Sequence, residues 1–134
     1  MGQPAARQTD PVTGVDVHIV MVPAPPGAPV PTPLPHPFAG QLTDAVSTDV
    51  LIGGLAAATI GSVAQNLPPH LPTPPGTAFQ RPPTNRGSVL TGSATVLING
   101  KGAARLGDTV TTCNDPANAP VSTITGGSPT VLIG

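Results

Sequence analysis

One sequence unit occurs three times in this chain, and this internal repeat constrains the fold more than any other feature. The clearest copy, residues 92–108, reads as a strand, an Asn99-Gly100 turn and a second short strand ending at Gly107-Asp108. Asn-Gly between apolar runs is a strong hairpin signal, because it tolerates the positive φ angles of a two-residue turn. Residues 47–62 align with this copy without a gap and place Gly53-Gly54 at the turn. We therefore expect a series of β-hairpins.

The third copy is split between the two ends of the sequence. Residues 2–10 align with residues 100–108, and residues 127–134 align with residues 92–99. We expect the C-terminal strand to pair beside the N-terminal segment and complete the third hairpin, which leaves no free edge between the first and last units. The prediction is a single domain over 1–134 with pseudo-threefold symmetry. Its repeat units are 2–46 completed by 127–134, 47–91 and 92–126.

The composition favours an all-β fold and excludes several functions. The sequence has no Glu and one Lys, so it cannot supply the charged outer face that long amphipathic helices need. Five basic and six acidic residues give a formal net charge of −1, which argues against nucleic-acid binding through phosphates. No secretory signal is visible at the N-terminus. The longest apolar stretch, residues 50–64, is too short to span a bilayer and is interrupted by glycines.

Proline is the second unusual feature of the composition. The chain has 20 prolines and 16 glycines, a level that on its own suggests low complexity, but the Val, Ile and Leu runs and the repeat oppose that interpretation. Residues 22–38 hold a dense proline run. Such a run favours polyproline II geometry and could be a ligand for a proline-recognising domain. We prefer a stiff surface connection between repeat units.

The histidines and the cysteine suggest a metal site. His18 follows Arg7 at the same spacing as His70 follows Thr59, and Arg7 and Thr59 are equivalent repeat positions. Cys113 lies near the matching place in the third unit. A structural zinc site takes four His or Cys ligands, so we add His36, the one remaining candidate, by elimination. The alternatives are ordinary surface histidines, or an open zinc site with three ligands and water.

Enzymatic signatures are missing from the sequence. A His-Glu-x-x-His zinc helix needs Glu, and neither a Gly-x-Ser-x-Gly elbow nor a phosphate loop followed by Lys occurs. We expect a non-enzymatic protein without catalytic residues. One structural zinc ion could stabilise a core that is poor in aromatic residues, by on the order of 10 kcal/mol.

The N-terminal motif and the repeat resemble those of a known family. Pro4-Ala5-Ala6-Arg7 matches the namesake motif of PAAR-repeat proteins, and residues 92–108 look like the same family's repeat. The resemblance implies a small, sharp cone of three pseudo-threefold hairpin repeats with proline-rich connections, and a zinc near its vertex held by three His and one Cys. The implied ligands are His18, His36, His70 and Cys113. The middle unit departs from the motif, because it reads Ala-Ala-Ala-Thr.

The resemblance also implies a function. Such proteins cap and sharpen the trimeric, VgrG-like spike of type VI secretion systems or phage-tail-like particles, where they aid membrane puncture and can carry effectors. We expect one chain per threefold spike, synthesis in the bacterial cytoplasm and incorporation into a secreted particle. We recognise no fused toxin domain in the sequence, so we expect a tip protein without an effector of its own. The alternative is a proline-rich, zinc-binding interaction module without a puncturing role.

Overall fold

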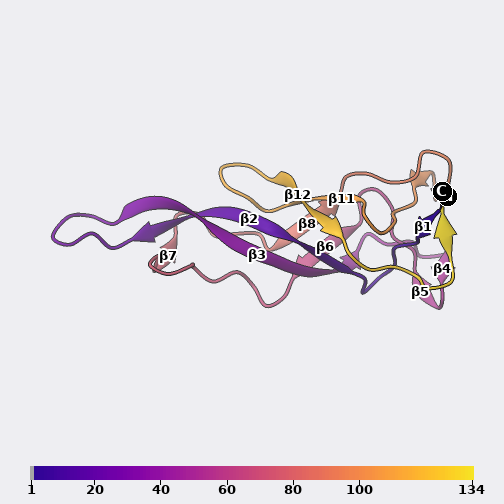
Figure 1. Cartoon of the computed structure of the whole chain (residues 1–134), viewed down its shortest axis with the longest axis horizontal. Coiled ribbons are helices and arrows are strands. Elements are labelled where there is room, and N and C mark those ends of the chain that lie inside the picture. The colour runs from indigo at the N-terminus through magenta and orange to yellow at the C-terminus, as the bar shows by residue number, and fades with distance from the viewer. Residues whose placement is uncertain (1) are drawn as a thin grey trace.

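The computed structural model describes residues 2–134, and these residues form strands and turns without a helix, which confirms the all-β prediction. The molecule is elongated, with a long hairpin at one end and the short terminal strands at the other (Figure 1). None of the described residues forms a helix that could span a membrane. The strands are β1 (Gln3–Pro4), β2 (Pro11–Val22), β3 (Val30–Asp44), β4 (Leu51–Ile52), β5 (Leu55–Ala56), β6 (Val63–Asn66), β7 (Ala78–Phe79), β8 (Arg86–Val89), β9 (Leu97–Ile98), β10 (Lys101–Gly102), β11 (Thr109–Thr112), β12 (Ala119–Ile124) and β13 (Leu132–Ile133).

Three short antiparallel pairs form one end of the molecule, which we call the base: β4–β5, β9–β10 and β1–β13. The last pair joins the two ends of the chain, with Gln3 opposite Ile133 and Pro4 opposite Leu132. The predicted completion of the third hairpin is therefore confirmed. Asn99 and Gly100 both have positive φ, at 53° and 78°, as the Asn-Gly hairpin signal predicted.

The three units contact one another around a common axis through their alanines. The N–H groups of Ala6, Ala58 and Ala104 each donate to the carbonyl of another member of this set, and the three bonds form a closed ring. Beneath the ring, each unit also contributes one buried isoleucine and one buried alanine to a small apolar layer, namely Ile52, Ile98 and Ile133 with Ala5, Ala57 and Ala103. The repeat thus becomes a pseudo-threefold base whose small residues let three backbones meet at the axis.

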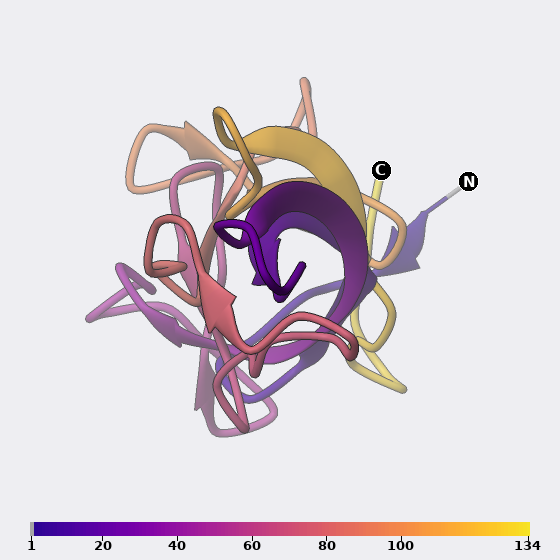
Figure 2. The same ribbon diagram turned by 90° about the vertical axis from the view of Figure 1, so that its left-hand side faces the viewer.

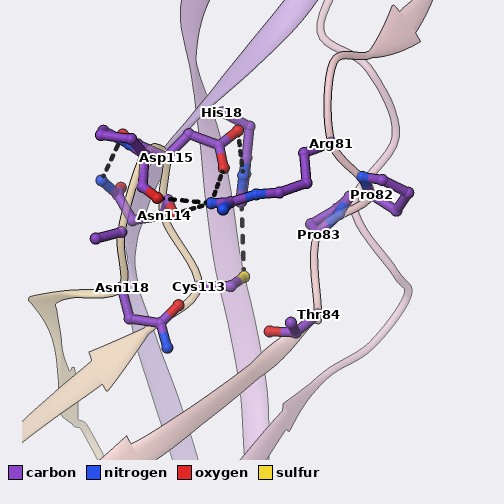
Figure 3. Close-up of a pocket in the computed structure, with 11 residues that line it drawn as sticks. His18, Arg81, Pro82, Pro83, Thr84, Cys113, Asn114, Asp115 and Asn118 are labelled. Carbon is purple, nitrogen blue, oxygen red and sulfur yellow. Dashed lines mark hydrogen bonds and ion pairs between the residues drawn. The ribbon is translucent and has the colours of Figure 1, made fainter.

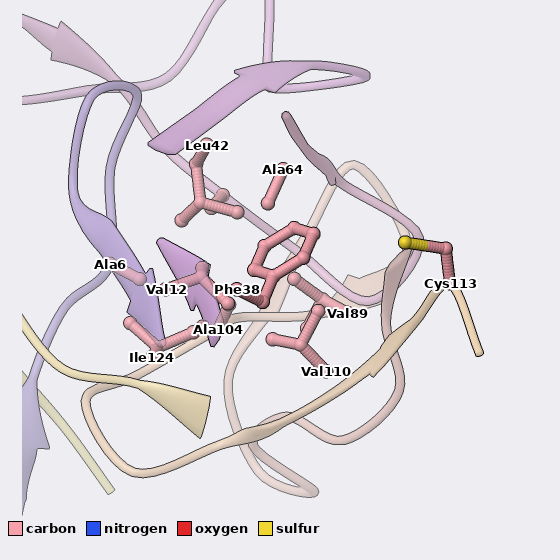
Figure 4. Packing of buried hydrophobic residues seen from close by; sticks show 11 residues of the cluster. Ala6, Val12, Phe38, Leu42, Ala64, Val89, Ala104, Val110, Cys113 and Ile124 are labelled. Carbon is pink, nitrogen blue, oxygen red and sulfur yellow. The ribbon is translucent and has the colours of Figure 1, made fainter. Parts of the chain in front are cut away.

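The larger sheet forms the body above the base. Its strands pair in the order β12, β11, β8, β6, β3, β2, and β12 pairs again with β2, so the sheet closes on itself. The interior holds Val12, Phe38, Leu42, Val110 and Ile124, all at most 1% exposed (Figure 4). Viewed along the long axis, the remaining strands and loops surround the β2–β3 hairpin (Figure 2). This core is aliphatic apart from Phe38. The buried histidines lie next to one end of it.

The proline run forms a strand, which corrects the prediction of a stiff connection in polyproline II geometry. β3 pairs with β2 continuously from Val30, opposite Val22, to Gln41, opposite Pro11. The prolines of β3 stand at every second residue, namely Pro31, Pro33, Pro35 and Pro37. Proline cannot donate to a neighbouring strand, so a strand accepts it only where its nitrogen faces a free edge.

The contacts of the neighbouring strand confirm that these prolines face outward. The backbone groups of three β2 residues, Val17, Ile19 and Met21, form hydrogen bonds on the side away from β3. Their partners are residues that follow β11 and residues around β7. Their partners across the pair are prolines of β3, whose nitrogens must therefore also point away from β2. The outer edge of β3 over residues 31–37 consequently carries carbonyl acceptors without N–H donors, and one of them, the carbonyl of Pro35, accepts the hydroxyl of Thr73 at 2.8 Å.

Candidate metal centre

Four buried side chains bring their ligand atoms together where the β2–β3 hairpin leaves the body. Asp16, His18, His70 and Cys113 offer a carboxylate oxygen, two imidazole nitrogens and a thiol sulfur that all lie within 4.8 Å of one another. Asp16 and His18 lie on the inner face of β2, because alternate residues of a strand point the same way. His70 comes from the segment between β6 and β7, and Cys113 directly follows β11. The cluster thus joins three separate parts of the chain.

The carboxylate of Asp16 lies at the centre of the contacts. Its Oδ2 accepts a hydrogen bond from Nε2–H of His70 at 3.0 Å and another from the thiol of Cys113 at 3.3 Å. Its Oδ1 accepts from the hydroxyl of Thr112. The sulfur of Cys113 is also 3.6 Å from Nε2 of His18. All four predicted partners except His36 therefore meet at this carboxylate or beside it.

His36 packs against the cluster but directs its ring nitrogens elsewhere. Its ring centroid is 5.3 Å from that of His18 and 5.6 Å from that of His70. Its Nδ1–H donates to the carbonyl of Leu34 at 2.9 Å, and its Nε2 accepts the N–H of Thr73 at 3.1 Å. As a fourth ligand, His36 would have to give up the bond with Thr73. Its assignment stays a prediction.

Asp16 is the residue that sequence reasoning missed. It lies two positions before His18, and the β2 segment alternates between buried and exposed side chains around it. In a strand, that spacing places both side chains on one face. The Asp-x-His pattern was therefore a usable signal, but only once this segment was assigned to a strand.

The protonation states of the cluster suit a divalent cation. Burial lowers the pKa of His18 and of His36, so both imidazoles are neutral near pH 7 and keep a lone pair. Burial, followed by the nearby charge of Asp16, raises the pKa of the Cys113 thiol to about 12. A metal ion would displace that proton, so metal affinity should rise with pH. Two imidazoles, a thiolate and a carboxylate together fit one cation that accepts nitrogen, sulfur and oxygen ligands.

An open cavity of about 360 Å³ lies beside the cluster, on the side of His18 and Cys113 (Figure 3). Arg81 and Asp115 line it and form an ion pair at 2.7 Å. Two of the four side chains of the candidate metal centre, His18 and Cys113, line the cavity, which connects the centre with solvent. It is a route by which an ion could enter or leave.

A comparison with models of protein families finds a match to the C-terminal part of the chain. The family model for the PAAR motif matches residues 80–134, which include Cys113, the repeat at 92–108 and β13. No curated protein matches the chain. Proteins with this motif are associated with spike complexes of secreted injection machines, and the match supports a spike-tip-associated role. Residues 80–134 thus carry the PAAR motif, which confirms the chain's resemblance to the PAAR-repeat proteins of contractile injection systems.

Proposed function

We propose that this chain is a non-enzymatic tip that caps and sharpens a trimeric, VgrG-like spike. The observation that carries the proposal is a set of three repeat-related leucines at the base. Leu51, Leu97 and Leu132 are 63%, 62% and 63% exposed, and each is the first residue of a hairpin strand. Large apolar side chains that stay exposed in a symmetric set are typical of a binding surface. We call them the leucine triplet.

The leucine triplet favours a threefold partner. Three equivalent side chains around one axis can make three equivalent contacts with a trimer, although they belong to a single chain. A partner without threefold symmetry would leave some of these leucines unused. One chain per spike trimer follows from the same argument, and the hairpin backbones beside the leucines could extend the strands of the spike.

The opposite end suits a leading point. The β2–β3 hairpin extends away from the base along the long axis (Figure 1). A narrow point concentrates the force that a contracting sheath delivers, so the proposal includes a role in puncturing a target membrane. Exposed faces of the body remain available for effector attachment. After assembly the protein would leave the producing cell as part of the particle.

The metal in this proposal is one structural zinc ion. It would be held by His18, His70 and Cys113, with Asp16 or His36 as the fourth ligand. The ion would tie β2 to the end of β11 and to the segment between β6 and β7, at the root of the protruding hairpin. Structural zinc contributes directly to folding free energy, which a puncturing tip with a small aliphatic core would need.

The spike-binding experiment compares matched leucine variants. Leu97→Gln, and the triple change of Leu51, Leu97 and Leu132 to Gln, should weaken binding to the trimeric spike protein of the same system. The control is Leu71→Gln, because Leu71 is 79% exposed but lies outside the base. Titration calorimetry should show at least tenfold weaker binding for Leu97→Gln. The triple variant should show no detectable binding. Unchanged binding by the triple variant would refute the docking surface, and a proline-rich interaction module would become the better account.

A further inference from the structure

A buried carboxylate lies beside His18, on the side of the ring that faces away from the candidate metal centre. Oδ2 of Asp115 is 3.4 Å from Nδ1 of His18, and the two side chains are 5% and 1% exposed. Among the described residues, Nδ1 of His18 is buried and has no hydrogen-bond partner. The other ring nitrogen, Nε2, lies 3.6 Å from the sulfur of Cys113. His18 therefore stands between a metal ligand and a carboxylate (Figure 3).

The backbone of the 113–116 segment fixes the position of Asp115. The N–H of Asp115 donates to the carbonyl of Val17 at 2.8 Å, and the N–H of Ile19 donates to Oδ2 of Asp115 at 2.9 Å. The side chain of Asn114 accepts the N–H of Val17 at 2.6 Å. These bonds lay the segment along the outer edge of β2, directly beside His18. The carboxylate is thus held by the same strand that carries the histidine.

Arg81 closes the arrangement from the surface. Its Nη2 donates to Oδ1 of Asp115 at 2.7 Å and to the carbonyls of Asn114 and Pro116 at 3.4 and 2.9 Å. The Arg81 side chain is 60% exposed, whereas that of Asp115 is almost fully buried. One surface guanidinium therefore holds both the carboxylate and the loop that follows Cys113.

We propose that Asp115 is a positioning residue for the metal centre and that Arg81 holds it in place. The carboxylate of Asp115, 3.4 Å from Nδ1 of His18, would accept the Nδ1–H once the metal is bound and so fix the tautomer whose Nε2 lone pair faces the cluster. A histidine ligand commonly donates its other ring nitrogen to a carboxylate in this way, and loss of such a partner typically costs about 10–100-fold in metal affinity. Arg81 acts through Asp115 and through the loop after Cys113. The inference rests on the proposed metal centre.

The test measures zinc release and the tautomer of His18 in the full chain. Zinc-loaded wild type, Asp115→Asn and Arg81→Ala are mixed with excess chelator, and the release rate is followed with a colorimetric zinc indicator. We expect release at least tenfold faster for Asp115→Asn and several-fold faster for Arg81→Ala, with partial recovery in Arg81→Lys. Controls are Asp44→Asn and Lys101→Ala, which change exposed side chains outside this network.

Nitrogen NMR of the histidine rings gives the second measurement. Wild type should show His18 with a protonated Nδ1, and Asp115→Asn should show a changed Nδ1 signal. Unchanged release rates together with an unchanged signal would overturn the positioning role. If Asp115→Asn does not fold, Arg81→Ala becomes the deciding variant, because Arg81 is an exposed side chain. Zinc release from Arg81→Ala at the wild-type rate would then overturn the positioning role. If wild type binds no zinc at all, the proposed metal centre fails and the inference fails with it.

Discussion

The backbone N–H of Ala58 donates to the carbonyl of Ala6 at 3.0 Å, although the two residues belong to different repeat units. Ala6 in turn donates to Ala104, and Ala104 donates to Ala58, so the chain closes a three-membered ring of hydrogen bonds around its own axis. All three side chains are at most 1% exposed. A larger side chain in this ring would push the three units apart.

The first prediction concerns packing in that ring. Ala58→Val should lower the free energy of unfolding by about 1–3 kcal/mol, because two extra methyl groups enter a closely packed site. The matched control is Ala24→Val, which makes the same change at an exposed position in the apex of the β2–β3 hairpin. Urea denaturation at equal metal content measures both. Equal stability of the two variants would show that the ring is not tightly packed.

The second prediction uses a turn where the three units differ. Gly61 and Gly107 have φ of 92° at equivalent positions, whereas the N-terminal unit places Thr9 there with φ of 76°. A β-branched residue is strained at positive φ, and this strain costs roughly 1–2 kcal/mol. Thr9→Gly should therefore stabilise the protein, by about 0.5–1 kcal/mol after the greater flexibility of unfolded glycine is subtracted.

The reciprocal change serves as the control for that turn. Gly107→Thr introduces the same strain into the third unit and should lower the melting temperature, while Thr9→Gly raises it. Differential scanning calorimetry resolves both shifts. A melting temperature that falls in Thr9→Gly would mean that contacts of the Thr9 side chain outweigh its backbone strain.

The third prediction concerns the outer edge of β3. Replacement of Pro31, Pro33, Pro35 and Pro37 with Thr restores N–H donors on this edge and adds a good strand former, so the edge can pair with another chain. We expect concentration-dependent oligomers of the variant and a single-chain mass for wild type, measured by light scattering after size exclusion.

The control for the edge removes the same number of prolines from the hairpin apex. Pro23, Pro25, Pro26 and Pro29 lie outside the strands, so their replacement with Thr should leave the protein at the mass of one chain. Oligomers of both variants would mean that loss of proline in general, rather than the edge of β3, causes association.

The base could be predicted from the sequence because it follows from turn signals and from the internal repeat. The turns at Asn99-Gly100 and Gly53-Gly54 and the split third unit all follow from the alignment of the repeats. The body could not be predicted in the same way. Prolines are ordinarily read as strand breakers, and residues 30–38 form a strand only because the proline nitrogens point away from β2, a property of the sheet rather than of the segment.

The metal centre was predicted in part for a similar reason. Repeat spacing puts His18 and His70 at equivalent positions and Cys113 near the matching one, and the structure gathers these three side chains in one buried group with Asp16. Their role as metal ligands stays a prediction. Asp16 and His36 lie opposite each other in the β2–β3 pair, so their relation to the cluster depends on strand register. Elimination among His and Cys residues could not consider a carboxylate, and that is why Asp16 was missed.

The fourth prediction distinguishes the two candidates for the fourth ligand. From the positions of the ligand atoms, Asp16→Asn should weaken zinc binding at least tenfold. His36→Gln should retain the wild-type affinity, because the ring nitrogens of His36 bond Leu34 and Thr73 rather than the cluster. Competition with a zinc indicator measures both affinities. Loss of zinc in His36→Gln with retention in Asp16→Asn would instead place His36 in the fourth position, as the family resemblance implies.

Native mass spectrometry of the chain mixed with its trimeric spike protein tests the central claim most directly. The account predicts one complex, whose mass equals three spike chains, one tip chain and one zinc ion. The triple leucine variant should give only the free components. A complex with three tip chains per trimer, or no complex between folded, zinc-loaded tip and spike, would contradict the account.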